Sequence, residues 1–158
     1  MILFPHIIVG AVIGSKVNNF WLVAILGLVS HLILDQIPHW DYLTYQDVTD
    51  FKKGKKLKTI LKASIDIITG FVFLFIFICN YQLSFKQLML IIVGIFFSVL
   101  PDFIWGLSMI FDNKTLFKYR NFNNKIHCKT QKEGKITFLG IFSQIAIIAV
   151  SLLLLFVF

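Results

Sequence analysis

The chain has 158 residues, of which 58% are hydrophobic and only 15% are charged. A soluble domain carries about 25% charged residues, so this composition excludes an ordinary soluble domain. The charges are also unevenly spread, because long windows contain none, and this is typical of membrane helices. The sequence therefore predicts an all-α integral membrane protein in which residues 1–158 form a single membrane domain.

The net charge of +7 has two readings, nucleic-acid binding and membrane topology. The lysines and arginines gather in two loops beside apolar segments, and this is the pattern that the positive-inside rule produces. We therefore expect no specific nucleic-acid partner, and membrane lipids, including anionic headgroups, as natural partners.

Apolar segments make up most of the chain and predict a bundle of four to five transmembrane helices. The first segment is short for a crossing, which takes about 20 residues. Pro38 is expected to end the second segment, because the residue before a proline is pushed out of the helical region. Pro101 and Asp102 are expected to break the fourth. The predicted helices cover about 2–14, 20–37, 58–79, 85–110 and 136–158.

The polar connections predict the orientation. Loops 40–58 and 112–135 carry five and seven cations, whereas the turns on the other side contain only Lys16 and Lys86. This asymmetry predicts a multi-pass protein of the cell membrane, with both basic loops and the N-terminus in the cytoplasm.

One stretch at the end of the second segment holds ionisable groups where they are costly. His31 and Asp35 are four residues apart and share a helix face. Pro38 then turns the chain, so that His39 and Asp41 can point back toward the same place. Ionisable groups inside a membrane helix indicate a functional site.

The predicted topology brings other ionisable groups to the same side of the membrane. Taken alone, several have simpler explanations: His6 as an interfacial residue, Asp66 in a salt bridge with Lys62, and Asp102 as a helix N-cap. Together they predict a metal site. The candidate metal ligands are His6, His31, Asp35, Asp66, Asp102 and His127.

The chemistry of these residue types favours a divalent transition metal. Mixed imidazole and carboxylate ligands suit Zn²⁺ first, with Mn²⁺ and Fe²⁺ as alternatives, and the number of candidates allows one or two ions. His39 and Asp41 are predicted as catalytic residues, acting as ligands or in proton transfer. Ser98 and Gln144 are candidates for hydrogen bonds to the ligands, or else between helices.

These motifs resemble a known family. Pro5-His6, then His31-x-x-x-Asp35-x-x-Pro38-His39-Trp40-Asp41, then Asp66 and Leu100-Pro101-Asp102, look like the small bacterial membrane-bound metal-dependent hydrolases. That group includes the LexA-binding inner-membrane-associated proteins and is distantly similar to zinc-dependent phospholipase C-like folds. Many members carry a His-Arg-x-x-Thr-His-Ser element that this chain lacks, which leaves His127 for that role.

The resulting functional hypothesis is metal-dependent hydrolysis at the cytoplasmic membrane face. The depth of the site favours a lipid or amphiphilic ester, such as a phosphoester drawn in by the lysine-rich loops. Two other classes stay open: a non-catalytic membrane adaptor with a structural metal site, and a transporter of metal ions or protons.

Overall fold

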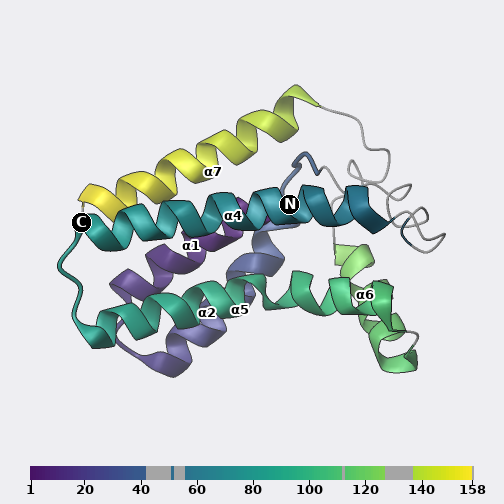
Figure 1. The fold of residues 1–158 in the computed structure, drawn as a ribbon, viewed down its shortest axis with the longest axis horizontal. Coiled ribbons are helices and arrows are strands. Elements are labelled where there is room, and N and C mark those ends of the chain that lie inside the picture. Colours follow the sequence, from purple (N-terminus) through teal and green to yellow (C-terminus); the bar gives the residue numbers. More distant parts are fainter. Residues whose placement is uncertain (42–50, 52–55, 112, 127–136, 158) are drawn as a thin grey trace.

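A computed structural model describes residues 1–41, 51, 56–111, 113–126 and 137–157. These parts of the chain are helical and contain no strand, which confirms the predicted all-α class. Figure 1 shows a bundle of long, roughly aligned helices with one helix set across its end. The helices are α1 (Leu3–Lys16), α2 (Phe20–Leu34), α4 (Lys56–Asn80), α5 (Phe85–Ile110), α6 (Lys114–Ile126) and α7 (Phe138–Val157).

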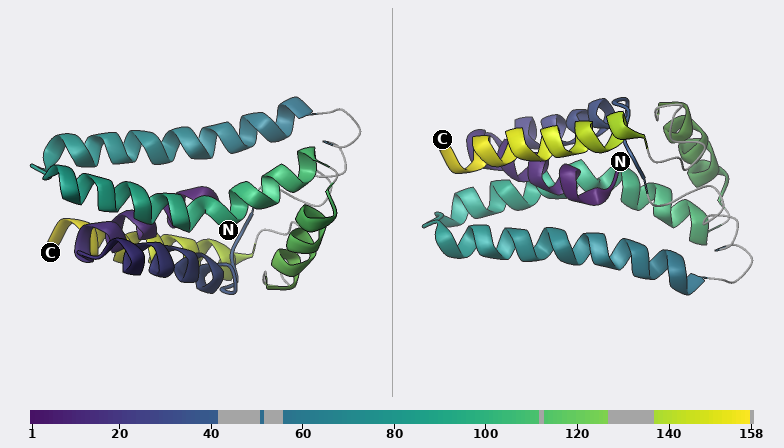
Figure 2. Two further views of the ribbon diagram at one scale, coloured as in Figure 1. Left: turned by 90° about the horizontal axis from the view of Figure 1, so that it is seen from below. Right: turned by 90° about the horizontal axis from the view of Figure 1, so that it is seen from above.

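Three helices of the described chain are long and apolar enough to cross a membrane, namely α4, α5 and α7. The expected number of four to five is therefore too high by this measure. At about 1.5 Å per residue, α1 and α2, with 14 and 15 residues, are roughly 21–23 Å long, short of a hydrocarbon core of about 30 Å. They form a hairpin that penetrates the bundle without matching its length (Figure 2).

Three other expectations differ from the structure. Helix α5 continues through Pro101 and Asp102 instead of breaking there, because the neighbouring helices support it. The predicted basic loop 112–135 contains α6, whose polar composition conceals its helical character. Helix α2 ends at Leu34, earlier than Pro38 alone predicts, with Asp35 as its C-cap.

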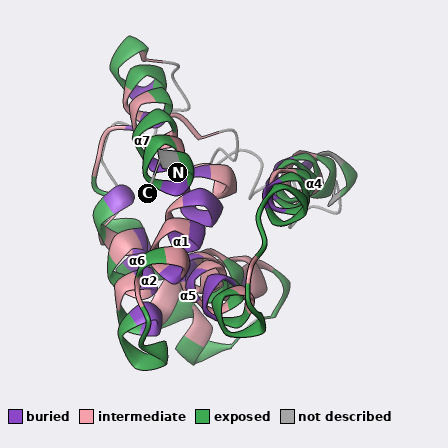
Figure 3. Cartoon of the chain, turned by 90° about the vertical axis from the view of Figure 1, so that its left-hand side faces the viewer, coloured by how far each residue is buried: buried purple, intermediate pink, exposed green. Residues whose placement is uncertain are grey.

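Helix α1 lies at the centre of the bundle and contacts α2, α4, α5 and α7 (Figure 3). The apolar core joins four helices through Ile7, Ala11, Leu74, Phe77, Ile91 and Leu155. Helices α1 and α5 cross closely because glycines, which have no side chain, lie at the contact. A Cβ atom on Gly10 would lie 2.6 Å from the carbonyl oxygen of Gly94, and one on Gly94 would strike Gly10.

Candidate metal centre

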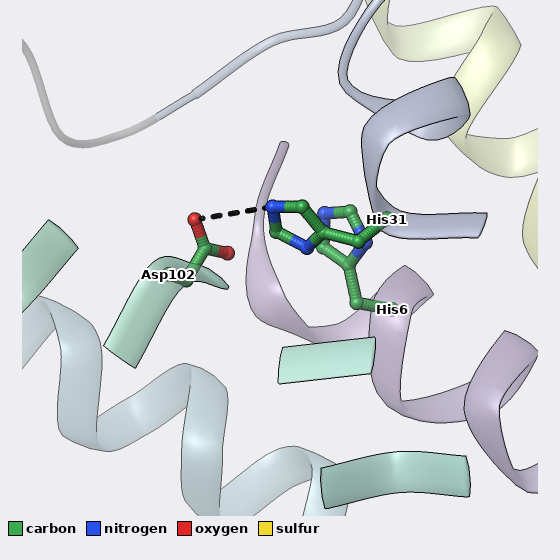
Figure 4. Close-up of side chains that lie close together, drawn as sticks. All are labelled: His6, His31 and Asp102. Atoms are coloured by element: carbon green, nitrogen blue, oxygen red, sulfur yellow. Dashed lines mark ion pairs between the residues drawn. The ribbon is translucent and has the colours of Figure 1, made fainter. Parts of the chain in front are cut away.

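Three helices contribute side chains to one buried cluster. His6 comes from α1, His31 from α2 and Asp102 from α5, and one potential ligand atom of each lies within 4.8 Å of the others (Figure 4). Both imidazoles are fully buried, and His31 Nε2 lies 3.8 Å from Asp102 Oδ1. Asp102 is eight residues from the end of α5, so the cluster is about 12 Å inside that helix.

The orientation of His31 is fixed by the backbone of α5. Its Nδ1 atom lies 2.8 Å from the carbonyl oxygen of Ser98. Because a carbonyl oxygen only accepts, we assign a proton to Nδ1. Nε2 is then the ring atom that faces the carboxylates of Asp35 and Asp102, and it can take either a second proton or a metal ion. Metal-binding histidines commonly donate their second nitrogen to a carbonyl in this way.

His6 is stacked against His31, with ring centroids 4.3 Å apart. Three ring nitrogens make no hydrogen bond of acceptable geometry with the described residues: Nδ1 and Nε2 of His6, and Nε2 of His31. Buried polar atoms of this kind are rare and call for an explanation. The hydroxyl of Ser98 donates to the carbonyl oxygen of His6 over 2.7 Å, so α5 also positions this second imidazole.

Asp35 adjoins both histidines at the C-terminal end of α2. Its carboxylate oxygens lie 3.3 Å from His6 Nε2 and 3.0 Å from His31 Nε2. The Met1 amino group donates to the same carboxylate over 2.8 Å. Burial alone would raise the pKa of Asp35, but the close contacts with His31 and His6 and the Met1 charge lower it below its ordinary range. Asp35 is therefore an anion that needs positive charge beside it.

The Met1 amino group is a cation that the side-chain pattern did not predict. It lies 4.0 Å from Asp41 Oδ2 in addition to its contact with Asp35. Burial alone would lower the pKa of this amino group, but the carboxylates of Asp35, Asp41 and Asp102 raise it above its ordinary value. No side-chain motif signals such a contribution, because a main-chain amine is invisible in residue patterns.

Asp66, another predicted ligand, lies outside the three-residue cluster. Its carboxylate accepts hydrogen bonds from the backbone nitrogens of Leu3 and Phe4, at the start of α1. The first amides of a helix have no partners within the helix, and its N-terminus favours negative charge. Asp66 thus caps α1 from α4 and thereby holds His6, only two residues further along, in place.

The segment after α2 holds the two predicted catalytic residues. His39 is buried, and its Nδ1 atom lies 2.7 Å from the carbonyl oxygen of Ile37. Burial and the nearby Met1 charge lower the pKa of His39 to about 4, so this ring is neutral near pH 7. The carboxylate of Asp41 lies 4.0 Å from the Met1 amino group, which in turn contacts Asp35 beside the cluster. His127 lies outside the described residues.

Helix α7 fixes this segment. Ser143 donates its hydroxyl to the carbonyl oxygen of Pro38, and Gln144 donates its amide to that of Trp40 over 2.6 Å. Gly140 allows the close approach, since a Cβ atom there would lie 3.0 Å from the backbone of His39. The polar groups of α7 therefore bind the backbone beside the site. Gln144 bonds to a connecting segment, neither to a metal ligand nor to another helix as expected.

Two buried imidazole nitrogens and a partly buried carboxylate are a ligand set that suits a transition metal ion. The buried Nε2 atoms of His6 and His31 lie beside the carboxylates of Asp35 and Asp102, an arrangement that fits a cation between them. The fold and the cluster together define a helical protein with membrane-span-like helices and a buried His/Asp group that could hold a metal ion. No protein-family model, curated protein or solved structure matches this chain.

Proposed function

We propose that this chain is a membrane-embedded, metal-dependent hydrolase that acts at the basic, cytoplasmic end of the bundle. The observation that carries the proposal is the convergence of His6, His31 and Asp102 from three helices, with His31 already oriented by Ser98. The resemblance of the His31–Asp41 motif to membrane-bound metal-dependent hydrolases supports the same class.

The ligand set would be His6 Nε2, His31 Nε2 and a carboxylate oxygen of Asp102. A bound Zn²⁺, Mn²⁺ or Fe²⁺ ion supplies an acidified water and a Lewis acid for a carbonyl or phosphoryl oxygen. Three protein ligands leave a position open, as catalytic rather than structural zinc sites do. Asp35, whose oxygens lie 3.3 Å and 3.0 Å from these same two Nε2 atoms, would balance the charge of the ion.

His39 and Asp41 are proposed as the proton-transfer groups. A neutral His39 can accept a proton near pH 7, whereas a charged imidazole cannot. Asp41 lies on the same connecting segment, and its side chain is 17% exposed and so within reach of water. Both residues follow the C-terminal end of α2, which is the end of that helix that bears Asp35.

The proposed substrate is a lipid or amphiphilic ester, with a phosphoester as the leading candidate. The cluster lies about 12 Å inside α5, a depth that favours substrates partitioned into the bilayer. Cations of the basic end would attract an anionic headgroup. Transport is less well supported, because beyond Ser98, toward the turn between α4 and α5, Ser151 is the only buried polar side chain of the described chain.

Elemental analysis of protein purified without chelators tests the metal. We expect close to one equivalent of transition metal in the wild type and its loss in His31→Ala and Asp102→Asn. His39→Ala is the matched control, because it removes a buried histidine outside the cluster and should keep the metal. Wild-type protein without metal, and unable to take it up from added Zn²⁺, Mn²⁺ or Fe²⁺, would refute the proposal.

Turnover distinguishes an enzyme from a structural site. Metal-loaded protein in nanodiscs should hydrolyse members of a panel of fluorogenic phospholipids and fatty esters, and His31→Ala should not. Stoichiometric metal that raises the melting temperature without any turnover would instead identify the cluster as a structural clamp between α1, α2 and α5.

A further inference from the structure

We propose that α6 is a membrane-surface helix whose lysine-bearing face binds the anionic headgroups of phospholipids at the basic end of the bundle. The proposal concerns residues 114–126 and their contacts with α5, and it does not require a bound metal ion.

The orientation of α6 suits a membrane surface. It begins four residues after the end of α5, one of the helices able to cross a membrane. In perpendicular views α6 lies across the end of the bundle instead of continuing along it (Figures 1 and 2). A helix that follows a spanning helix directly and runs crosswise lies in the plane of the headgroups.

The inner face of α6 is tied to α5 by side-chain hydrogen bonds. Tyr119 donates its hydroxyl to the carbonyl oxygen of Pro101 over 3.1 Å, and the indole of Trp105 donates to Asn124 over 3.3 Å. Burial, followed by the charges of Asp102 and Asp35, raises the pKa of Tyr119 to about 12, so its hydroxyl stays a donor at physiological pH. These contacts determine which face of α6 points away from the protein.

The outer face combines positive charge with apolar rings. At about 100° per residue, Lys114, Lys118 and Lys125 project within roughly 40° of one another. Phe117 and Phe122 flank this lysine face on its two sides and are 53% and 55% exposed. A face turned only toward water gains nothing from two exposed phenylalanines, whereas at a bilayer their rings enter the acyl boundary while the ammonium groups meet phosphates.

The charge of the helix favours anionic over zwitterionic lipid. Residues 114–126 contain four cations and no acidic residue. The fourth cation, Arg120, lies over the ring of Phe117, with its guanidinium carbon 5.1 Å from the ring centroid. Basic residues next to a membrane surface each contribute about 1 kcal/mol to its binding, which corresponds to about a fivefold change per residue.

The contact between α6 and α5 connects the lipid-binding face to a residue next to Asp102. The carbonyl that Tyr119 binds belongs to Pro101, whose next neighbour in the chain is Asp102. Headgroups that hold α6 in place therefore also hold the part of α5 that bears this carboxylate.

A depth measurement on the full-length protein tests the proposal. A nitroxide is attached to Asn121→Cys, an exposed position beside the lysines, in a Cys79→Ser/Cys128→Ser background. Its accessibility to oxygen and to a water-soluble nickel chelate reports depth in nanodiscs of phosphatidylcholine alone or mixed with phosphatidylglycerol. We expect headgroup depth in the anionic discs, and a shift toward water in Lys114→Gln/Lys118→Gln/Lys125→Gln.

Two controls keep the result interpretable. Lys16→Gln/Lys86→Gln removes cations at the opposite end and should leave the label at its depth. About 1 M salt shortens the Debye length to about 3 Å and should move the label of the unsubstituted helix outward, even if the triple variant misfolds. A label at water depth in anionic discs, or one insensitive to lipid charge, to salt and to the triple substitution, would overturn the proposal.

Discussion

The imidazole of His31 in α2 contacts the backbone of Ser98 in α5, with Nδ1 2.8 Å from the carbonyl oxygen. The same serine donates its hydroxyl to the carbonyl oxygen of His6. One residue of α5 therefore holds the ring of His31 and the backbone that carries His6. The remaining lone pair of His31 faces Asp35 and Asp102, an arrangement that is stable only with a positive charge, whether a proton or a metal ion, between these groups.

Ser98→Ala isolates the hydroxyl, because it leaves the carbonyl oxygen that binds His31 unchanged. The carbonyl oxygen of His6 then loses a partner in a buried site, at a cost of about 1–3 kcal/mol. Loss of such a supporting contact typically weakens metal binding by about 10–100-fold. Competition with a fluorescent zinc chelator measures this change. Ser108→Ala is the control, since that hydroxyl bonds within its own helix; equal affinities in both variants would contradict the assigned role.

The crossing of α1 and α5 predicts opposite effects for two glycines of the same helix. Gly94→Ala places a Cβ atom against the backbone of Gly10, and backbone cannot move aside as a flexible side chain can. We expect the free energy of unfolding to fall by about 1–3 kcal/mol. Gly106→Ala meets nothing within 4 Å and should be neutral or stabilising by up to about 1 kcal/mol. Thermal unfolding in detergent compares the two, and similar melting temperatures would argue against a close crossing.

Much of the site could be predicted from the spacing of residues along helices and from the distribution of lysines. His31 and Asp35 share a face by spacing alone, and the distribution of lysines placed His6 and Asp102 on the same side. Both arguments use only helix periodicity and the positive-inside rule. Three of the predicted ligands, His6, His31 and Asp102, do lie together.

The parts that sequence reasoning missed depend on contacts between distant segments. Asp66 carries no sign that the amides of Leu3 and Phe4 lie beside it. The depth of the α1–α2 hairpin depends on packing around Gly10 and Gly94, which hydropathy does not detect. Helix α6 was missed because its lysines and asparagines resemble a loop, although residues spaced as Leu116, Tyr119 and Asn123 are typical of a helix face.

Asp66→Asn separates a cap from a ligand. The amide keeps one acceptor oxygen but replaces the other with a donor that faces a backbone N–H, and it removes the charge that favours the N-terminus of α1. We expect a loss of about 1–3 kcal/mol in stability with the metal retained. Thermal unfolding and elemental analysis are run on the same samples. Asp102→Asn should show the reverse pattern, and loss of metal from Asp66→Asn in folded protein would make Asp66 a ligand after all.

The buried His39 predicts a pH-dependent loss of stability. In the unfolded chain this ring takes up a proton near pH 6.5, whereas in the folded protein it does so only near pH 4. Between these values the unfolded state binds more protons, so stability falls as the pH falls, by at most about 3 kcal/mol.

The difference between wild type and His39→Gln isolates this contribution from those of other groups. Melting temperatures of the two proteins should diverge least near pH 4 and most at pH 7, with the wild type gaining as the pH rises. Parallel curves from pH 4 to 7 would show that His39 titrates alike in the folded and unfolded states.

The shortness of α2 has a consequence for the surrounding bilayer. Its outward face is apolar and includes Trp21, Ile25, Val29 and Ile33, all exposed. This face offers lipid chains only about 22 Å of apolar length, while α4 and α5 on the other side offer a full crossing. Hydrophobic mismatch of this size is relieved by local thinning of the bilayer. Beside α2 the headgroup layer would therefore dip toward the level of His31 and Asp35, shortening the path between the headgroups and the candidate metal centre.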